Sequence, residues 1–257
     1  MKKQASIKDN ISAASLIIVI LIVWHFLTTT GIVGPFLLPK PLDVVKAFIE
    51  DFPTIFSHLK TTLLEAFLGL LCGVSLGFIA ALSMDFSDTL YHALYPILVL
   101  TQTVPTVAIA PLLVLWMGYG ILPKIVLIVI VTFFPVAISL LEGFKSVDPD
   151  KIKLLKAMGA DKYKIYKYIK IPESMGNFFS SFKIAVSYSV VGAVIAEWLG
   201  GFKGLGVYMI RVQQNYSFDK MFAVIFLISG ISLILMKLVN FLQKKTMPWI
   251  EEDKWKI

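Results

Sequence analysis

The 257-residue chain has little charge, one cysteine and few histidines. Charged side chains make up 16% of the residues and hydrophobic ones 57%, whereas an average soluble domain carries about 25% charged residues. The single cysteine, Cys72, excludes an intrachain disulfide and lies in an apolar run without metal-ligand spacing. The three histidines, His25, His58 and His92, are far apart in the sequence and form no ligand motif. We therefore expect no disulfide framework, no metal site and no catalytic site.

The sequence also contains no G-x-x-x-x-G-K-[ST] loop of the kind that holds nucleotide phosphates. Its glycine-rich stretch, GGFKGLG at 200–206, directly follows an apolar run, and we interpret it as a turn outside the membrane. We therefore expect no cofactor in this chain.

Long apolar runs are abundant. The mean hydropathy is +0.80, and several runs reach the roughly 18–20 residues that cross a bilayer. We expect an all-α transmembrane fold in which residues 1–257 form a single membrane domain embedded in the lipid bilayer. The expected spans lie at about 11–28, 60–84, 89–117, 121–141, 178–199 and 220–243.

Lysines gather before the first span, after the last and in the long loop 142–177 between the fourth and fifth. With six spans, these three segments lie on one side of the membrane, and the positive-inside rule assigns that side to the cytoplasm. Both termini are therefore predicted to be cytoplasmic. The net charge of +7 then reflects the flanks of the spans, and we expect no binding of nucleic acid.

The third expected span contains Pro96, Pro105 and Pro111, together with a polar trio at 101–103. A proline frees backbone carbonyls, which is tolerated in lipid where neighbouring helices or a water-filled path satisfy them. Two interpretations stay open, a kinked packing helix and a helix that lines a translocation path. Glu197 near the outer end of the fifth span is a second polar feature, either a functional acid within the membrane or a hydrated group at its surface. The candidate path residues are Gln102, Thr103, Pro105 and Glu197.

Other patterns concern packing and the membrane surface. The glycines at 69, 73 and 77 recur every four residues, a spacing that lets helices approach closely. The segment KPLDVVKAFIE (40–50) predicts an amphipathic surface helix that starts near Pro41. We expect Glu65 and Lys183 to extend their charged ends toward the membrane surface.

The basic loop 142–177 is too ordered for a linker. Asp148 and Pro149 predict the start of a helix, and Gly159 predicts its end. Asp161 predicts the cap of a second helix through about Ile169, which Pro172 closes. Helices this short need a surface to lie against, either the membrane or the groove of a soluble partner.

The spacing in this loop resembles the EAA loop of bacterial ABC importer permeases. That pattern is Glu-Ala-Ala, three residues, Gly, nine residues, Ile, one residue and Leu-Pro. Here Gly159, Ile169 and Ile171-Pro172 keep the spacing, and Lys153-Leu154-Leu155 stand at the Glu-Ala-Ala positions.

Three further stretches resemble the nitrate/sulfonate/taurine-type permeases of that group. They are LLPKPLDVVKAF, TQTVPTVAIAPLLVLWMGYG and VVGAVIAEWLGGFKGLGVYM, so the resemblance covers nearly the whole chain.

The resemblance implies a six-span, MetI-like permease in the bacterial cytoplasmic membrane. It implies two permease copies, here a homodimer, that form the path for a small solute, either sulfonate-, nitrate- or taurine-like or related to thiamine or riboflavin precursors. A cytoplasmic ATPase dimer, which binds ATP and Mg²⁺, and an extracytoplasmic solute-binding protein would be its partners. The positions that the resemblance assigns to ATPase coupling are Lys153, Leu155, Lys156, Ala157, Met158, Gly159, Ala160, Asp161, Ile169 and Pro172.

The alternative is a self-contained membrane protein, either a secondary carrier or a membrane enzyme. A carrier is expected to show buried ion-coupling acids and repeated halves, and an enzyme to cluster His, Asp or Cys at one membrane face. The sequence displays neither pattern.

Overall fold

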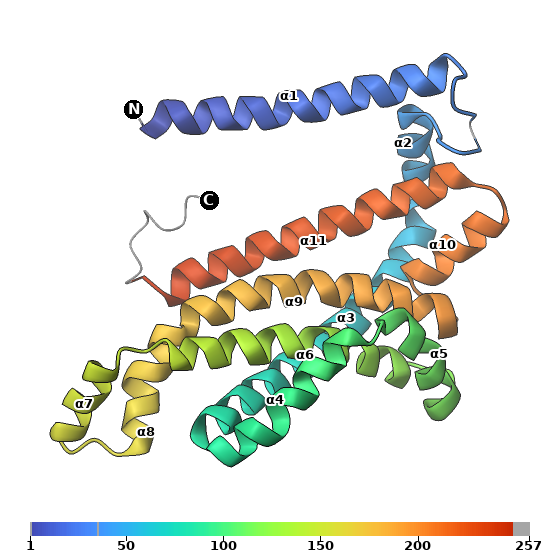
Figure 1. The fold of residues 1–257 in the computed structure, drawn as a ribbon. Coiled ribbons are helices and arrows are strands. Elements are labelled where there is room, and N and C mark those ends of the chain that lie inside the picture. The colour runs from blue at the N-terminus through green and yellow to red at the C-terminus, as the bar shows by residue number, and fades with distance from the viewer. Residues whose placement is uncertain (1, 35, 249–257) are drawn as a thin grey trace. The chain divides into compact units, whose positions relative to one another are not determined.

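The computed structural model describes residues 2–34 and 36–248, with side chains from residue 15 onward, and this part of the chain is helical without strands (Figure 1). The all-α expectation is confirmed. The elements are α1 (Lys2–Thr29), α2 (Pro41–Glu50), α3 (Phe52–Phe86), α4 (Asp88–Thr103), α5 (Thr106–Met117), α6 (Leu122–Lys145), α7 (Pro149–Ala157), α8 (Lys162–Ile165), a π-helical turn (Tyr166–Lys170), α9 (Ile171–Gly200), α10 (Leu205–Gln214) and α11 (Phe218–Thr246).

Four stretches in the described part are long and apolar enough to cross a membrane: α3, α6, the continuous segment Lys162–Gly200 and α11. The pair α4 and α5 would make a fifth span, but the two helices are bent by 102° at a short break. The expected first span, 11–28, overlaps a shorter apolar stretch, Ser15–Thr29 of α1, and residues 11–14 have no described side chains. The six-span count stays a prediction.

The expected third span is wrong as a single helix, because the chain breaks between α4 and α5. Val104 (φ −85°, ψ 122°) and Pro105 (φ −61°, ψ 119°) are both extended. Pro105 favours this conformation at Val104, because a proline disfavours the helical conformation of the residue before it. Pro96 and Pro111 lie inside α4 and α5 without ending either helix. Of the three prolines, Pro105 therefore makes the break.

The chain divides into two compact units, and the first comprises Met1–His58 and Tyr208–Leu227. In this unit Asp51 accepts hydrogen bonds from the Tyr208 hydroxyl at 2.5 Å and from Lys220 Nζ at 3.2 Å. These bonds lower the pKa of the Asp51 carboxyl. The carboxylate thereby ties the α2–α3 junction to α10 and to the start of α11.

The helix expected from KPLDVVKAFIE is confirmed as α2, which starts at Pro41. The apolar side chains of α2 do not all face the same way, however. Val44 and Ala47 are buried, whereas Val45 and Ile49 are exposed.

The second unit comprises Leu59–Val207 and the residues from Ile228 onward, and the close approach of α3 to α6 lies within it. A Cβ added to Gly69 would lie 2.5 Å from the Cβ of Ile128, and one added to Gly77 would lie 2.9 Å from the carbonyl oxygen of Phe133. The small-residue spacing therefore serves packing between two helices of the same chain, as expected.

We expect Gly69→Ala to destabilise the protein by about 1–3 kcal/mol, because the new methyl group overpacks the contact with Ile128. The matched control is Gly230→Ala in α11, where an added Cβ meets nothing within 4 Å. The control should be neutral or more stable by up to about 1 kcal/mol, because alanine is the better helix former. Thermal unfolding of both variants in detergent tests the contact, and equal midpoints would contradict it.

Candidate functional site

The basic loop folds as its capping residues predict. The Asp148 side chain accepts a hydrogen bond from the Asp150 N–H at 2.9 Å, and Pro149 occupies the first turn of α7. The helix ends before Gly159, which has φ +81°, and the Ala160 N–H returns to the carbonyl oxygen of Leu155 at 3.0 Å. This is the left-handed termination that glycine favours. The predicted turn is confirmed.

The second helix of the loop is capped as expected but does not end where expected. Asp161 accepts a bond from the Lys164 N–H at 2.9 Å, and α8 passes into the π-helical turn and then into α9. The expectation that Pro172 closes this helix is wrong. In the wider turn the Ile171 N–H bonds to the carbonyl of Tyr166, and Pro172 follows as the second residue of α9 without interrupting the helix.

Two apolar side chains, Leu154 of α7 and Met158 directly after it, are exposed to solvent in the described chain. Leu154 is 64% exposed and Met158 76%, while Ile152 and Leu155 are half-buried. Lys151 Nζ binds Glu173 at 2.7 Å, which ties α7 to the first turn of α9.

The remaining coupling candidates divide into exposed and packed positions. Lys153 pairs with Asp150, three residues before it on the same surface. Ile169 is buried and Pro172 half-buried, so these two shape the loop from inside and present no surface to a partner. The exposed candidates are Lys153, Lys156, Ala157, Met158, Gly159 and Asp161, with Ala160 half-buried beside them.

A pocket of about 260 Å³ lies against the break between α4 and α5. Gln102 lines it, whereas Thr103, Pro105 and Glu197 are not among its lining residues. Thr103 directs its hydroxyl to the carbonyl of Leu100 at 2.8 Å. The lining side chains are all uncharged: Thr101, Gln102, Val104, Thr106, Leu127, Ile130, Val131, Tyr188, Val191 and Ile195, with Gly192.

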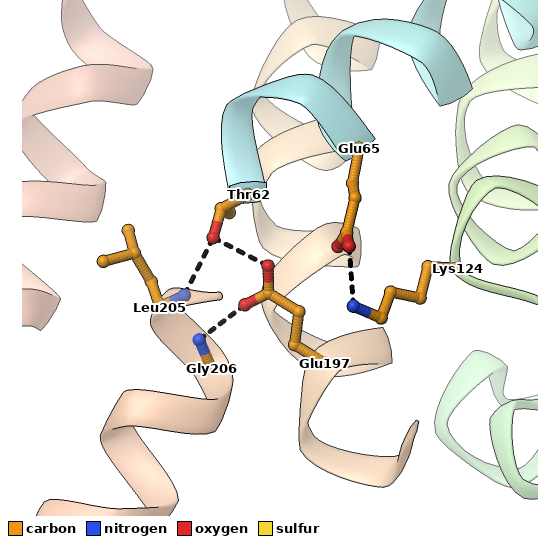
Figure 2. Close-up of polar contacts among 6 residues, drawn as sticks. All are labelled: Thr62, Glu65, Lys124, Glu197, Leu205 and Gly206. Atoms are coloured by element: carbon orange, nitrogen blue, oxygen red, sulfur yellow. Dashed lines mark hydrogen bonds and ion pairs between the residues drawn. The ribbon is translucent and has the colours of Figure 1, made fainter. Parts of the chain in front are cut away.

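Glu197 is 1% exposed and joins three segments (Figure 2). Its Oε1 accepts a bond from the Thr62 hydroxyl at 2.7 Å, and its Oε2 accepts one from the Gly206 N–H at 2.6 Å. The Thr62 oxygen in turn accepts a bond from the Leu205 N–H at 2.8 Å. The carboxylate and the threonine thus cap the start of α10, where backbone N–H groups have no partner within the helix.

The glycine-rich stretch 200–206 fits closely around this carboxylate. Gly204 has φ +137°, and a Cβ there would lie 2.1 Å from the Glu197 carboxylate. A Cβ on Gly206 would lie 2.3 Å from the carbonyl oxygen of Val194. The stretch is therefore a packed turn whose backbone donors bind a side chain of this protein.

The expectation that Glu65 extends toward the membrane surface is wrong. Glu65 is 2% exposed, and its Oε1 lies 2.6 Å from Lys124 Nζ, in the first turn of α6 (Figure 2). A sequence signal could have predicted this pair, since one acid and one lysine each stand inside an otherwise apolar run. Such isolated charges in a membrane protein tend to pair with each other.

We expect Lys124→Gln to destabilise the protein by about 3–5 kcal/mol, because it leaves the Glu65 carboxylate buried without its cation. The double variant Glu65→Gln/Lys124→Gln removes both charges and should recover most of that loss. Thermal unfolding of the two variants beside the unsubstituted protein measures the difference. A double variant as unstable as the single one would contradict the buried pair.

Residues 73–248 match the family model described as "Binding-protein-dependent transport system inner membrane component". The chain is 32% identical over 233 residues to the formylaminopyrimidine transport permease protein ThiX of Halalkalibacterium halodurans, which covers 90% of this chain and 93% of the relative. It is 29% identical over 238 residues to the taurine transport system permease protein TauC of Escherichia coli. That alignment covers 90% of this chain and 86% of TauC.

The fold is similar to that of solved transporters. A crystal structure of an amino acid ABC transporter with histidines matches with a TM-score of 0.62 at 18% identity, over 79% of this chain and 97% of that one. Together with the several apolar helices, these matches identify a multi-pass protein of the cytoplasmic membrane. The chain belongs to the family of binding-protein-dependent transport system inner membrane components, the ABC transporter permeases.

Proposed function

We propose that this chain is the path-forming permease subunit of an ATP-driven importer and that α7 couples it to the ATPase. Two copies form the path, a cytoplasmic ATPase pair binds ATP and Mg²⁺, and an extracytoplasmic binding protein delivers the solute. The chain itself performs no catalysis, and its termini lie in the cytoplasm. The observation that carries the proposal is the exposed apolar surface of Leu154 and Met158, held at a fixed angle by the Gly159 turn.

The connection from α7 to the pocket supports this assignment. The ion pair of Lys151 with Glu173 joins α7 to the first turn of α9, and α8 runs into α9 without a loop. Further along α9, Tyr188 and Val191 line the pocket at the α4–α5 break. A displacement of α7 by the ATPase therefore reaches the pocket along one continuous helix.

An ion-coupled carrier is the second candidate, because the structure does contain two buried acids. Neither acid suits that role. Glu65 is paired with Lys124, Glu197 accepts bonds from Thr62 and Gly206, and neither lines the pocket. The importer assignment accounts for both acids as parts of the packing.

We expect Gly159→Val to abolish solute-stimulated ATP hydrolysis by the assembled transporter, because a β-branched residue disfavours the positive φ at this turn. Gly159→Asn is the matched control, since asparagine tolerates this conformation and an added Cβ meets nothing within 4 Å. The measurement is the ATPase rate in proteoliposomes with the binding protein present. Full stimulation in Gly159→Val, or equal loss in both variants, would contradict the coupling role.

The pocket favours a neutral solute over an anionic one. A sulfonate or nitrate held there would be desolvated without a cation from the described residues of this chain, since the pocket lining carries no charge. Gln102 supplies an amide that both donates and accepts, and Tyr188 supplies an aromatic face. We infer a neutral heteroaromatic solute of the formylaminopyrimidine class, the solute for which the relative ThiX is named.

We expect Gln102→Leu to lower uptake of formylaminopyrimidine by roughly tenfold, because the solute loses a hydrogen-bonding partner in the pocket. The control is His92→Gln, an exposed polar position on the same helix that does not line the pocket. Uptake of labelled formylaminopyrimidine into proteoliposomes, with taurine as competitor, measures the effect. Uptake that taurine suppresses would contradict the neutral class, and unchanged uptake in Gln102→Leu would contradict the role of this pocket.

A further inference from the structure

A second pocket, of about 270 Å³, lies between the end of α3 and the α7–α8 pair. The proposed transport cycle gives this cavity no role of its own, although Lys156 in its lining is also an exposed coupling candidate. Its lining combines three lysines with one acid and several apolar or aromatic side chains: Asp85, Phe86, Ile152, Lys156, Lys162, Ile165, Tyr166 and Lys170.

The charges in this second pocket do not balance. Asp85 Oδ2 lies 2.6 Å from Lys170 Nζ and also accepts a bond from the Tyr166 hydroxyl at 2.5 Å, so its charge is already neutralised. Lys162 Nζ lies 4.6 Å from the centre of the Phe86 ring. Neither Lys156 nor Lys162 forms an ion pair within the part of the chain that the structure describes. The second pocket therefore presents two uncompensated ammonium groups.

The second pocket lies at the ends of two candidate membrane-spanning stretches. The stretch α3 ends at Phe86, and the stretch that includes α9 begins at Lys162. Phe86 is 57% exposed, and Ile79, two helical turns earlier on the same face of α3, is 58% exposed. An apolar surface thus leads from the membrane-spanning part of α3 directly to the lysines.

We propose that this second pocket binds the phosphate group of an anionic phospholipid. Lys156 and Lys162 donate hydrogen bonds to the phosphate oxygens, and an acyl chain lies along Ile79 and Phe86. A phosphate matches two lysines that form no ion pair with the described residues, and the adjoining apolar surface suits a lipid better than a soluble anion. Because the lysines belong to α7 and α8, the bound lipid would hold the basic loop against the end of α3.

The test uses the full-length protein in detergent, titrated with dioctanoyl phosphatidylglycerol, dioctanoyl phosphatidylcholine or inorganic phosphate. Native mass spectrometry gives the affinity, and thermal unfolding gives the stabilisation by each probe. We expect phosphatidylglycerol to bind, and Lys162→Gln to weaken that binding about fivefold, the loss typical of one lysine near an anionic lipid. The control Lys164→Gln removes the same charge from the same helix outside the second pocket and should leave the affinity unchanged, while Lys162→Arg should retain binding.

Several results would overturn the proposal. Equal weakening by Lys162→Gln and Lys164→Gln would show a diffuse attraction to basic charge without a defined site. If phosphatidylcholine binds as tightly as phosphatidylglycerol, the anionic headgroup is not what the pocket recognises. If inorganic phosphate stabilises the protein equally, the pocket is a site for soluble phosphate and not for a lipid. Reduced co-purification of the ATPase with Lys162→Gln, at unchanged lipid affinity, would assign the lysines to an acidic surface of that partner.

Discussion

Glu197 and Thr62 together cap the start of α10, and the packing of the second unit around this turn depends on that cap. The first turn of α10 exposes backbone N–H groups without helical partners, and inside an apolar protein such donors cost about 1–3 kcal/mol each when left unpaired. The Glu197 carboxylate accepts one of them and the Thr62 hydroxyl accepts another, while the two side chains bond to each other. The segment after α9 therefore has to fold back over α3, and only glycine fits at 204 beside the carboxylate.

The same requirement for internal partners explains why α3 and α6 lie so close together. A buried lysine or glutamate in an apolar helix is costly unless it pairs with an opposite charge, and Lys124 Nζ lies 2.6 Å from Glu65 Oε1. The glycines on the facing side of α3 allow this approach, because any side chain at 69 would meet Ile128. The charged pair and the small residues are thus two parts of one contact. Van der Waals packing and polar pairing take the place of the hydrophobic effect, which does little between helices in lipid.

The sequence predicted best those features that depend on neighbours along the chain. The cap of α7 at Asp148, the turn at Gly159 and the cap of α8 at Asp161 each follow from the chemistry of a few adjacent residues. The Glu65 pair was not predictable in this way, because its partner lies 59 positions further along the chain. Proline was ambiguous for a different reason. Pro105 breaks a helix and Pro172 does not, since an extended backbone precedes the first and a π-helical turn absorbs the second.

That difference between the two prolines bears on how a transporter of this design moves. Had a loop separated α8 from α9 at Pro172, motion of α7 would be lost in that loop. The continuous helix instead extends about 25 Å from Ile171 to Tyr188, at 1.5 Å per residue, and its far part lines the pocket. Opposite it, the break at Pro105 leaves irregular backbone at membrane depth, which is tolerated where it borders a cavity. In the proposed importer a continuous helix therefore faces the α4–α5 break across the pocket, and the solute passes between the two.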